Sequence, residues 1–188
     1  MRTGAQFAPF CNQERGTGMV LETERLILRK LTEQDFSDLC KILQDEEVMY
    51  AYEHAFLGEE VWAWVDKQLN RYAQYEFGLW AAILKETGEL IGQAGLTMQD
   101  CDGREVLEIG YLFQKAFWHK GYATEAAVAC RDYAFETLLA EEVYSIIRDN
   151  NIASQNVAKR VGMEKVGSFV KHYYGMDMPH DIYCIKKK

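Results

Sequence analysis

The order of hydrophobic patterns along the chain limits the folds that it can form. Apolar residues in strand-like patterns occur at 26–30, 77–84, 90–99, 106–113, 141–149, 164–174 and 181–187. Apolar residues at helical spacing occur at 32–48, 58–75, about 125–139 and 151–162. The resulting order is β, α, α, β, β, β, α, β, α, β, β. In this order, strands and helices neither alternate strictly nor fall into separate segments. The order therefore predicts a mixed α/β sheet with helices on both faces.

The length of 188 residues suits one domain with a substantial core. Residues 1–18 show no periodicity and are rich in Gly, Gln, Asn and Thr, so we expect a disordered extension there. The single domain is therefore predicted at 19–188. We expect no signal peptide and no membrane partner, because no apolar run approaches the roughly 18 residues that suggest a membrane span.

Charge and cysteine usage narrow the possible partners. The net charge is −8, from 29 acidic and 21 basic residues, which disfavours nucleic acid because phosphates need a basic face. This charge is compatible with a cationic substrate. The five cysteines are scattered and lack C-x-x-C spacing, which indicates reduced thiols in the cytoplasm and neither a disulfide framework nor a zinc site. We expect a monomer or homodimer.

The loop before the third helix suggests an anion site. The sequence WHKGYAT, residues 118–124, leads into a helix without proline or aspartate at its start. Gly121 permits backbone conformations closed to other residues and lets a ligand approach closely. Unpaired N–H groups at a helix start, together with the helix dipole, suit a pyrophosphate. From spacing alone, an ordinary loop–helix junction remains the alternative.

The same loop resembles the acetyl-CoA pyrophosphate loop, R/Q-x-x-G-x-G/A, of the GNAT N-acetyltransferase superfamily. The stretch W-H-K-G-Y-A-T-E-A resembles most closely the branch of Rim-type ribosomal-protein N-terminal acetyltransferases. The resemblance includes ETERLILR, EIGYLF and NNIASQNVAKRVGM and covers nearly all of 19–188. It implies the GNAT fold, a mostly antiparallel twisted sheet of about seven strands that splays between the fourth and fifth.

The resemblance also implies acetyl-CoA as co-substrate, with no metal. The backbone of Tyr111, Leu112 and Phe113 would pair with the pantetheine arm, as in strand addition. The residues that would hold the pyrophosphate are His119, Lys120, Gly121, Tyr122, Ala123 and Thr124. Asn151 and Ser154 match positions near the thioester, although Asn and Ser near a helix start are also ordinary N-caps.

The implied reaction is direct attack of a primary amine on acetyl-CoA within a ternary complex. Glu108 could remove the amine proton through water, or could instead face solvent or pair with a lysine. The backbone N–H of Leu112 would stabilise the oxyanion that develops. Many relatives have a tyrosine that acts as general acid at the position of Ala158 in this chain. Because that acid is missing here, Ser154 is the predicted proton donor to the leaving thiolate.

The acceptor amine is the least defined part of the prediction. Aromatic residues with an acid could hold a cationic amine, and the predicted contacts are Tyr52, Glu53, Trp62 and Tyr174. Aromatic residues on a helix are more often part of the core, which remains the alternative for Trp62. A peptide N-terminus, a polyamine and an antibiotic-like amine all remain possible acceptors.

Two other function classes compete with the enzyme. Because Ala158 removes the usual acid, the chain could be a catalytically degenerate acetyl-CoA-binding sensor or interaction module. A nucleotide-binding α/β domain would bind ATP or NAD, but the chain lacks both G-x-G-x-x-G and G-x-x-x-x-G-K-[ST].

Overall fold

The computed structural model describes residues 18–52, 54–173 and 175–187. Eight strands form one sheet in the order β1-β2-β3-β4-β5-β6-β8-β7. The strands are β1 (Met19–Glu22), β2 (Leu26–Lys30), β3 (Leu79–Leu84), β4 (Leu90–Cys101), β5 (Arg104–Phe113), β6 (Glu142–Arg148), β7 (Glu164–Tyr173) and β8 (Met176–Lys186). The helices are α1 (Phe36–Leu43), α2 (Gly58–Tyr75), α3 (Tyr122–Glu136) and α4 (Ile152–Val161).

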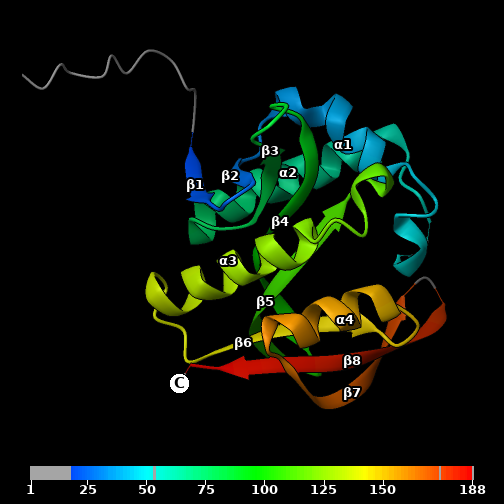
Figure 1. Cartoon of the computed structure of the whole chain (residues 1–188). Helices are drawn as coiled ribbons and strands as arrows, with labels where there is room; N and C mark the ends of the chain where they lie inside the picture. Colours follow the sequence, from blue (N-terminus) through cyan, green and yellow to red (C-terminus); the bar gives the residue numbers. More distant parts are fainter. Residues whose placement is uncertain (1–17, 53, 174, 188) are drawn as a thin grey trace, which may run out of the picture.

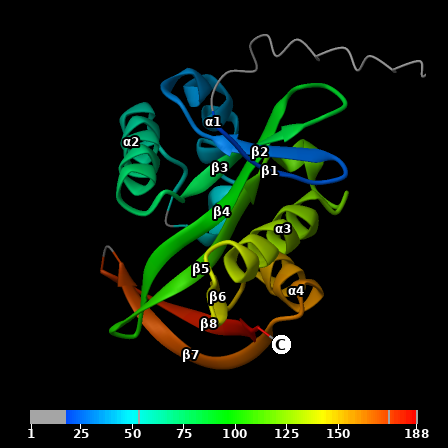
Figure 2. The same ribbon diagram turned by 90° about the vertical axis from the view of Figure 1, so that its left-hand side faces the viewer.

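The two helix pairs cover opposite faces of the sheet. Helices α1 and α2 lie on one face, and α3 and α4 lie on the other (Figure 2). The central strands supply the core between them, including the fully buried Leu28, Trp80 and Leu96. Helix α3 contributes Ala126 and Cys130, small residues that allow it to approach the sheet closely. This arrangement confirms the predicted mixed α/β sheet.

The sheet opens between β5 and β6. All other neighbouring strands pair antiparallel, whereas β5 and β6 are parallel and share one register pair in the described chain, Glu108 with Tyr144. From this vertex the strands run at an angle to each other (Figure 1). Beyond the vertex, β5 stays paired with β4 up to Phe113 opposite Gly92. The other edge of β5 therefore faces the opening, which lies where the family resemblance predicts the splay.

Three elements differ from the sequence prediction. The sheet has eight strands instead of about seven, because the four-residue β1 is too short for its hydrophobic pattern to be recognised. Strand β8 begins at Met176, earlier than the predicted residue 181, and includes Pro179, which interrupts a strand pattern in the sequence. The helical stretch predicted at 32–48 contains a 3₁₀ turn, Glu33–Asp35, before a shorter α1.

Candidate active site

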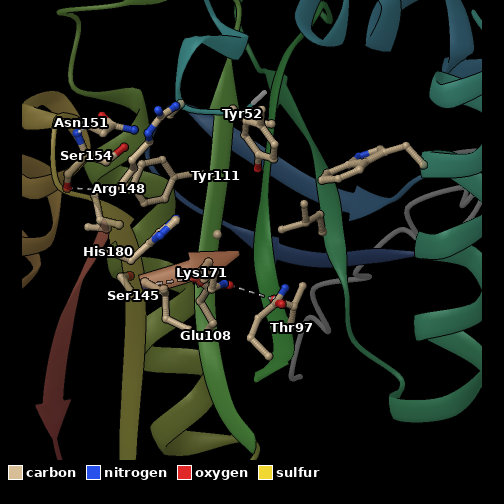
Figure 3. Close-up of a pocket in the computed structure, with 18 of the residues that line it drawn as sticks. Tyr52, Thr97, Glu108, Tyr111, Ser145, Arg148, Asn151, Ser154, Lys171 and His180 are labelled. Carbon is tan, nitrogen blue, oxygen red and sulfur yellow. Dashed lines mark hydrogen bonds between the residues drawn. The ribbon is translucent and has the colours of Figure 1, made fainter. Parts of the chain in front are cut away.

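A cavity of about 550 Å³ lies over the opening of the sheet. Its lining residues come from the α1–α2 connection, α2, the strands β3 to β8 and the start of α4. Figure 3 shows Glu108, Tyr111, Ser145 and Ser154 around this space. The cavity thus joins the vertex of the splay to the first turn of α4, which are far apart in the sequence.

Glu108 is held at the vertex by two hydrogen bonds. Its Oε1 accepts from the backbone N–H of Ile146 at 3.0 Å, and its Oε2 accepts from Thr97 Oγ1 at 3.4 Å. Burial raises the pKa of Glu108, although the Ile146 N–H and the positive charges of Lys171 and Arg71 oppose this shift. A carboxylate whose pKa is shifted towards neutral suits proton abstraction.

The start of α4 faces the same cavity. Asn151 is the N-cap of α4, and its Oδ1 accepts from the backbone N–H of Ser154 at 3.0 Å. The same Oδ1 accepts from the hydroxyl of Tyr50 at 2.7 Å. Asn151 therefore has the capping role that the sequence left open as the alternative, and it also lines the cavity.

Ser154 and Tyr111 bring two hydroxyl groups to this end of the cavity. The Tyr111 hydroxyl donates to the backbone carbonyl of Ser154 at 3.1 Å. The Ser154 side chain also lies beside the Tyr111 hydroxyl. Burial raises the pKa of the Tyr111 phenol, and the hydrogen bond with the Ser154 side chain opposes this larger effect. Sequence reasoning considered only the backbone of Tyr111 and missed its side chain.

The exposed edge of β5 leads from the cavity towards α3. Tyr111 and Leu112 line the cavity, while the ring of Phe113 is buried in the core against Gly92. The carbonyl of Phe113 accepts from Trp118 Nε1 at 2.8 Å, which orders the turn that follows the strand. The strand edge and the start of α3 are thus consecutive in the chain.

Helix α3 begins without a side-chain cap. Its N-cap is Gly121 with φ of 84°, a left-handed conformation that favours glycine, and no side chain accepts from its first N–H groups. His119 also has a positive φ of 61°. Lys120 and His119 are exposed. The geometry predicted for an anion site, a glycine turn in front of uncapped N–H groups, is present at 119–124.

Arg25 positions this loop, a contribution that the sequence did not indicate. Its Nη1 donates to the carbonyl of Lys120 at 2.9 Å, and its guanidinium pairs with Glu125 at 2.7 Å. It also lies 4.4 Å from the centre of the Tyr122 ring. Glu125 accepts from Thr23 Oγ1 at 2.6 Å as well. The β1–β2 turn is therefore bonded to the loop and to the first turn of α3.

The predicted acceptor residues are only partly brought together. Tyr52 lines the cavity and packs edge-on against Trp64, with ring centres 6.3 Å apart. Trp62 does not lie in the cavity wall. Its ring stacks on Phe36 of α1 at 4.2 Å, so that Trp64 is the tryptophan of α2 that faces the site. Glu53 and Tyr174, both predicted acceptor contacts, lie outside the described residues.

Several basic residues of the cavity wall were also missed. Lys67 and Arg71 come from α2, Arg148 from β6, Lys171 from β7 and His180 from β8. Each is isolated in the sequence, so only the fold reveals the group. In the described part of the chain, no three His, Cys, Asp or Glu side chains could together hold a metal ion. No described helix is long and apolar enough to cross a bilayer.

Comparison with known proteins agrees with this geometry. A family model described as "Acetyltransferase (GNAT) domain" matches residues 25–164. The chain is 36% identical to the uncharacterized protein YkkB of Bacillus subtilis, over 76% of this chain and 84% of that protein. It is 30% identical to the uncharacterized N-acetyltransferase YnaD of the same species, over 81% and 87%.

Solved structures give the same result. A GNAT-family acetyltransferase from Bacillus anthracis is 25% identical, with a TM-score of 0.75 over 88% of this chain and 96% of that chain. The ribosomal L7/L12 acetyltransferase RimL, solved with coenzyme A, shares the fold at 16% identity, with a TM-score of 0.72 over 89% and 97%. The matching domain model and the curated relatives show that the chain is an acyltransferase of the GNAT family.

Proposed function

We propose that the chain transfers an acetyl group from acetyl-CoA to a primary amine by direct attack within a ternary complex. The observation that supports this most strongly is the cavity at the splay, where Glu108, the free edge of β5 and the first turn of α4 meet. Curated relatives that are named N-acetyltransferases, such as YnaD, support the same reaction class.

The residues present fit acetyl-CoA. Strand β5 offers an unpaired backbone edge beyond Glu108, suited to the amides of a pantetheine arm. The loop 119–124 follows, with N–H groups and a helix dipole suited to a pyrophosphate. The Cβ of any residue replacing Gly121 would lie 3.4 Å from Arg25 Nη2, so the Arg25 side chain packs against the loop. When bound, acetyl-CoA supplies an acetyl group activated as a thioester.

One residue of the chain removes a proton from the amine, and another donates a proton to the leaving group. An alkylamine with a pKa of about 10 is mostly protonated at neutral pH, so Glu108 takes a proton from it, directly or through water. The backbone N–H of Leu112 donates to the acyl oxygen. Ser154 Oγ, which lines the cavity beside the Tyr111 hydroxyl, donates a proton to the leaving sulfur and is reprotonated through water by the proton that the attacking nitrogen loses. Asn151 holds Ser154 in place through its backbone N–H.

The test is an acetyl-transfer assay with the purified full chain. Release of free CoA is followed while a panel of amines is supplied, and the acetylated product is identified by mass spectrometry. The panel contains peptides with free N-termini, polyamines, amino acids and aminoglycosides. Amine-dependent release with a matching product is the expected result. Tight CoA binding without transfer to any amine would contradict the proposal and favour a binding module.

A further inference from the structure

Three positively charged side chains meet at one end of the cavity. Lys67 and Arg71 are one helical turn apart on α2, and Lys171 comes from β7 on the opposite wall. Figure 3 shows Lys171 beside Glu108 in this wall. Lys67 is exposed, whereas Arg71 and Lys171 are half-buried. The three thus form a basic cluster that is open to the cavity.

In the described part of the chain, no carboxylate forms an ion pair with this cluster, although Glu108 lies close enough to interact with the charges of Arg71 and Lys171. Among the described residues, Lys67, Arg71 and Lys171 form no ion pair within 4.0 Å. Arg71 Nη1 donates to Gln68 Oε1 at 3.3 Å, and the amine of Lys67 lies 5.9 Å from the centre of the Trp64 ring. Three positive charges outnumber the single carboxylate of Glu108 and repel one another, and a bound anion would relieve that repulsion.

Among the described residues, the cavity wall has two carboxylates, and both accept hydrogen bonds from groups outside the basic cluster. Glu60 accepts from the backbone N–H of Leu57 at 2.7 Å and lies 2.8 Å from His54. Glu108 accepts from Ile146 and Thr97. Although the Lys67 side chain as a whole is exposed, partial desolvation lowers the pKa of its amine, and the positive charges of Arg71 and Lys171 add to this shift. The local excess is positive although the chain as a whole is acidic.

The cluster lies too far from the helix start to serve the pyrophosphate. The charges of Arg71 and Lys171 act on Glu108, at the vertex of the splay. From Glu108 the strand runs five residues to Phe113, roughly 17 Å at the rise of a strand, before the chain turns towards the loop at 119–124. The basic cluster therefore lies near Glu108, the proposed general base, where the acceptor amine must bind.

Resting on the proposed function, we propose that the acceptor amine carries its own anionic group, a carboxylate or phosphonate, which Lys67, Arg71 and Lys171 bind. Because Lys171 lies beside Glu108 in the cavity wall, the bound anion and the reacting amine lie close to each other. Tyr52 and Trp64 on the adjoining wall suit an apolar or aromatic portion. The acceptor is thus of the amino-acid type, and a polyamine is disfavoured by charge repulsion.

Matched pairs of amines test this. Phenylalanine is compared with phenethylamine, leucine with 3-methylbutylamine, and alanine with ethylamine, at saturating acetyl-CoA, so that each pair differs by one carboxylate. A peptide pair that differs by Asp or Asn at the second position separates a free amino acid from an acidic N-terminus. In the pair that the enzyme uses best, we expect a higher kcat/KM for the member that carries the anionic group. Equal use of both members in all pairs, or a preference for the member that lacks the anionic group, would overturn the proposal.

Charge-removing variants assign the effect to the cluster. Lys67→Gln, Arg71→Gln and Lys171→Gln should each raise the KM of the anionic acceptor about ten- to a hundredfold, the usual worth of a hydrogen bond to a charged group. The KM of the matched amine that lacks the anionic group should change little. Lys41→Gln, at an exposed lysine of α1, is the control and should change neither, and melting temperatures check the fold of each variant.

The outcomes separate the two proposals. Equal rises in KM for both members of a pair would overturn the anion site while leaving the acetyltransferase in place. Transfer to no amine at all, with CoA still bound in calorimetry, would remove the proposed function and the acceptor proposal with it. Increased KM confined to the anionic member, with unchanged CoA affinity, would support both.

Discussion

Glu108 combines a buried position with two hydrogen-bond donors, which suits it to hold a proton for part of the cycle. We expect Glu108→Gln to lower kcat by about 10²–10⁴-fold near neutral pH, and by less as the pH rises and the free amine becomes more abundant. The wild-type rate should fall as the pH drops through the raised pKa of Glu108. Rates measured from about pH 6 to about pH 9 decide this. A variant with the wild-type profile would assign proton removal to water.

The same residue should affect stability with a defined sign. Because burial raises the pKa of Glu108 in the folded state above its unfolded value, the folded state binds more protons between the two pKa values. Stability from this group is present at low pH and is lost as the pH rises through the folded pKa. The melting temperature of Glu108→Gln, relative to wild type, should therefore increase from about pH 4 to about pH 8. Glu105→Gln, at an exposed residue of the same strand, should show no such trend.

Two hydroxyl groups compete for the role of proton donor. Ala158, at the position of the tyrosine in many relatives, is 2% exposed and packs in the core. If Ser154 is the donor, Ser154→Ala lowers kcat with little change in CoA affinity, because the contact matters mainly in the transition state. Tyr111→Phe is the matched variant, since it removes only the hydroxyl bonded to the Ser154 carbonyl. Full activity of Ser154→Ala with a loss in Tyr111→Phe would transfer the role to Tyr111.

At the scale of elements, the start of α3 depends on the left-handed Gly121. Gly121→Val should weaken CoA binding at least tenfold, because a β-branched residue at φ of 84° is strained and its Cβ lies against Arg25. Such strain costs about 1–3 kcal/mol, so the melting temperature falls as well. Gly88→Val is the control, with φ of +74° and open space around its Cβ in the β3–β4 turn. It should lose similar stability and keep CoA affinity, as calorimetry can show.

Elements with a strong local pattern were predictable from the sequence, and contacts between distant elements were not. The bounds of α2 match the predicted 58–75 because its apolar stripe is continuous over 18 residues. Strand β1 was missed because it has four residues, too few for a clear hydrophobic pattern, and it is a strand mainly through its pairing with β2. Arg25 donates to the carbonyl of Lys120 across 95 positions, and no local pattern indicates such a contact.

At the scale of the whole molecule, net charge does not describe the cavity wall. The net charge of −8 is compatible with a cationic substrate, whereas the cavity wall includes Lys67, Arg71 and Lys171 from two separate elements. Total charge affects solubility and long-range steering, whereas a ligand responds to the few groups at its own position. The family resemblance predicted where the sheet opens because that feature depends on backbone topology, which distant relatives share.

The domain boundary gives the last prediction. Among the described residues, the first strand, β1, begins at Met19, which pairs with Arg29 of β2. A protein that begins at Met19 should keep the melting temperature and the transferase rate of the full chain, although it loses the bond from the Lys30 N–H to the Gly18 carbonyl. A protein that begins at Arg25 should lose both, because it lacks β1 and also Thr23, which donates to Glu125 behind the loop at 119–124. Comparing the three chains by thermal unfolding and CoA release tests the boundary. A large loss in the Met19 chain would assign the preceding residues a role in the domain.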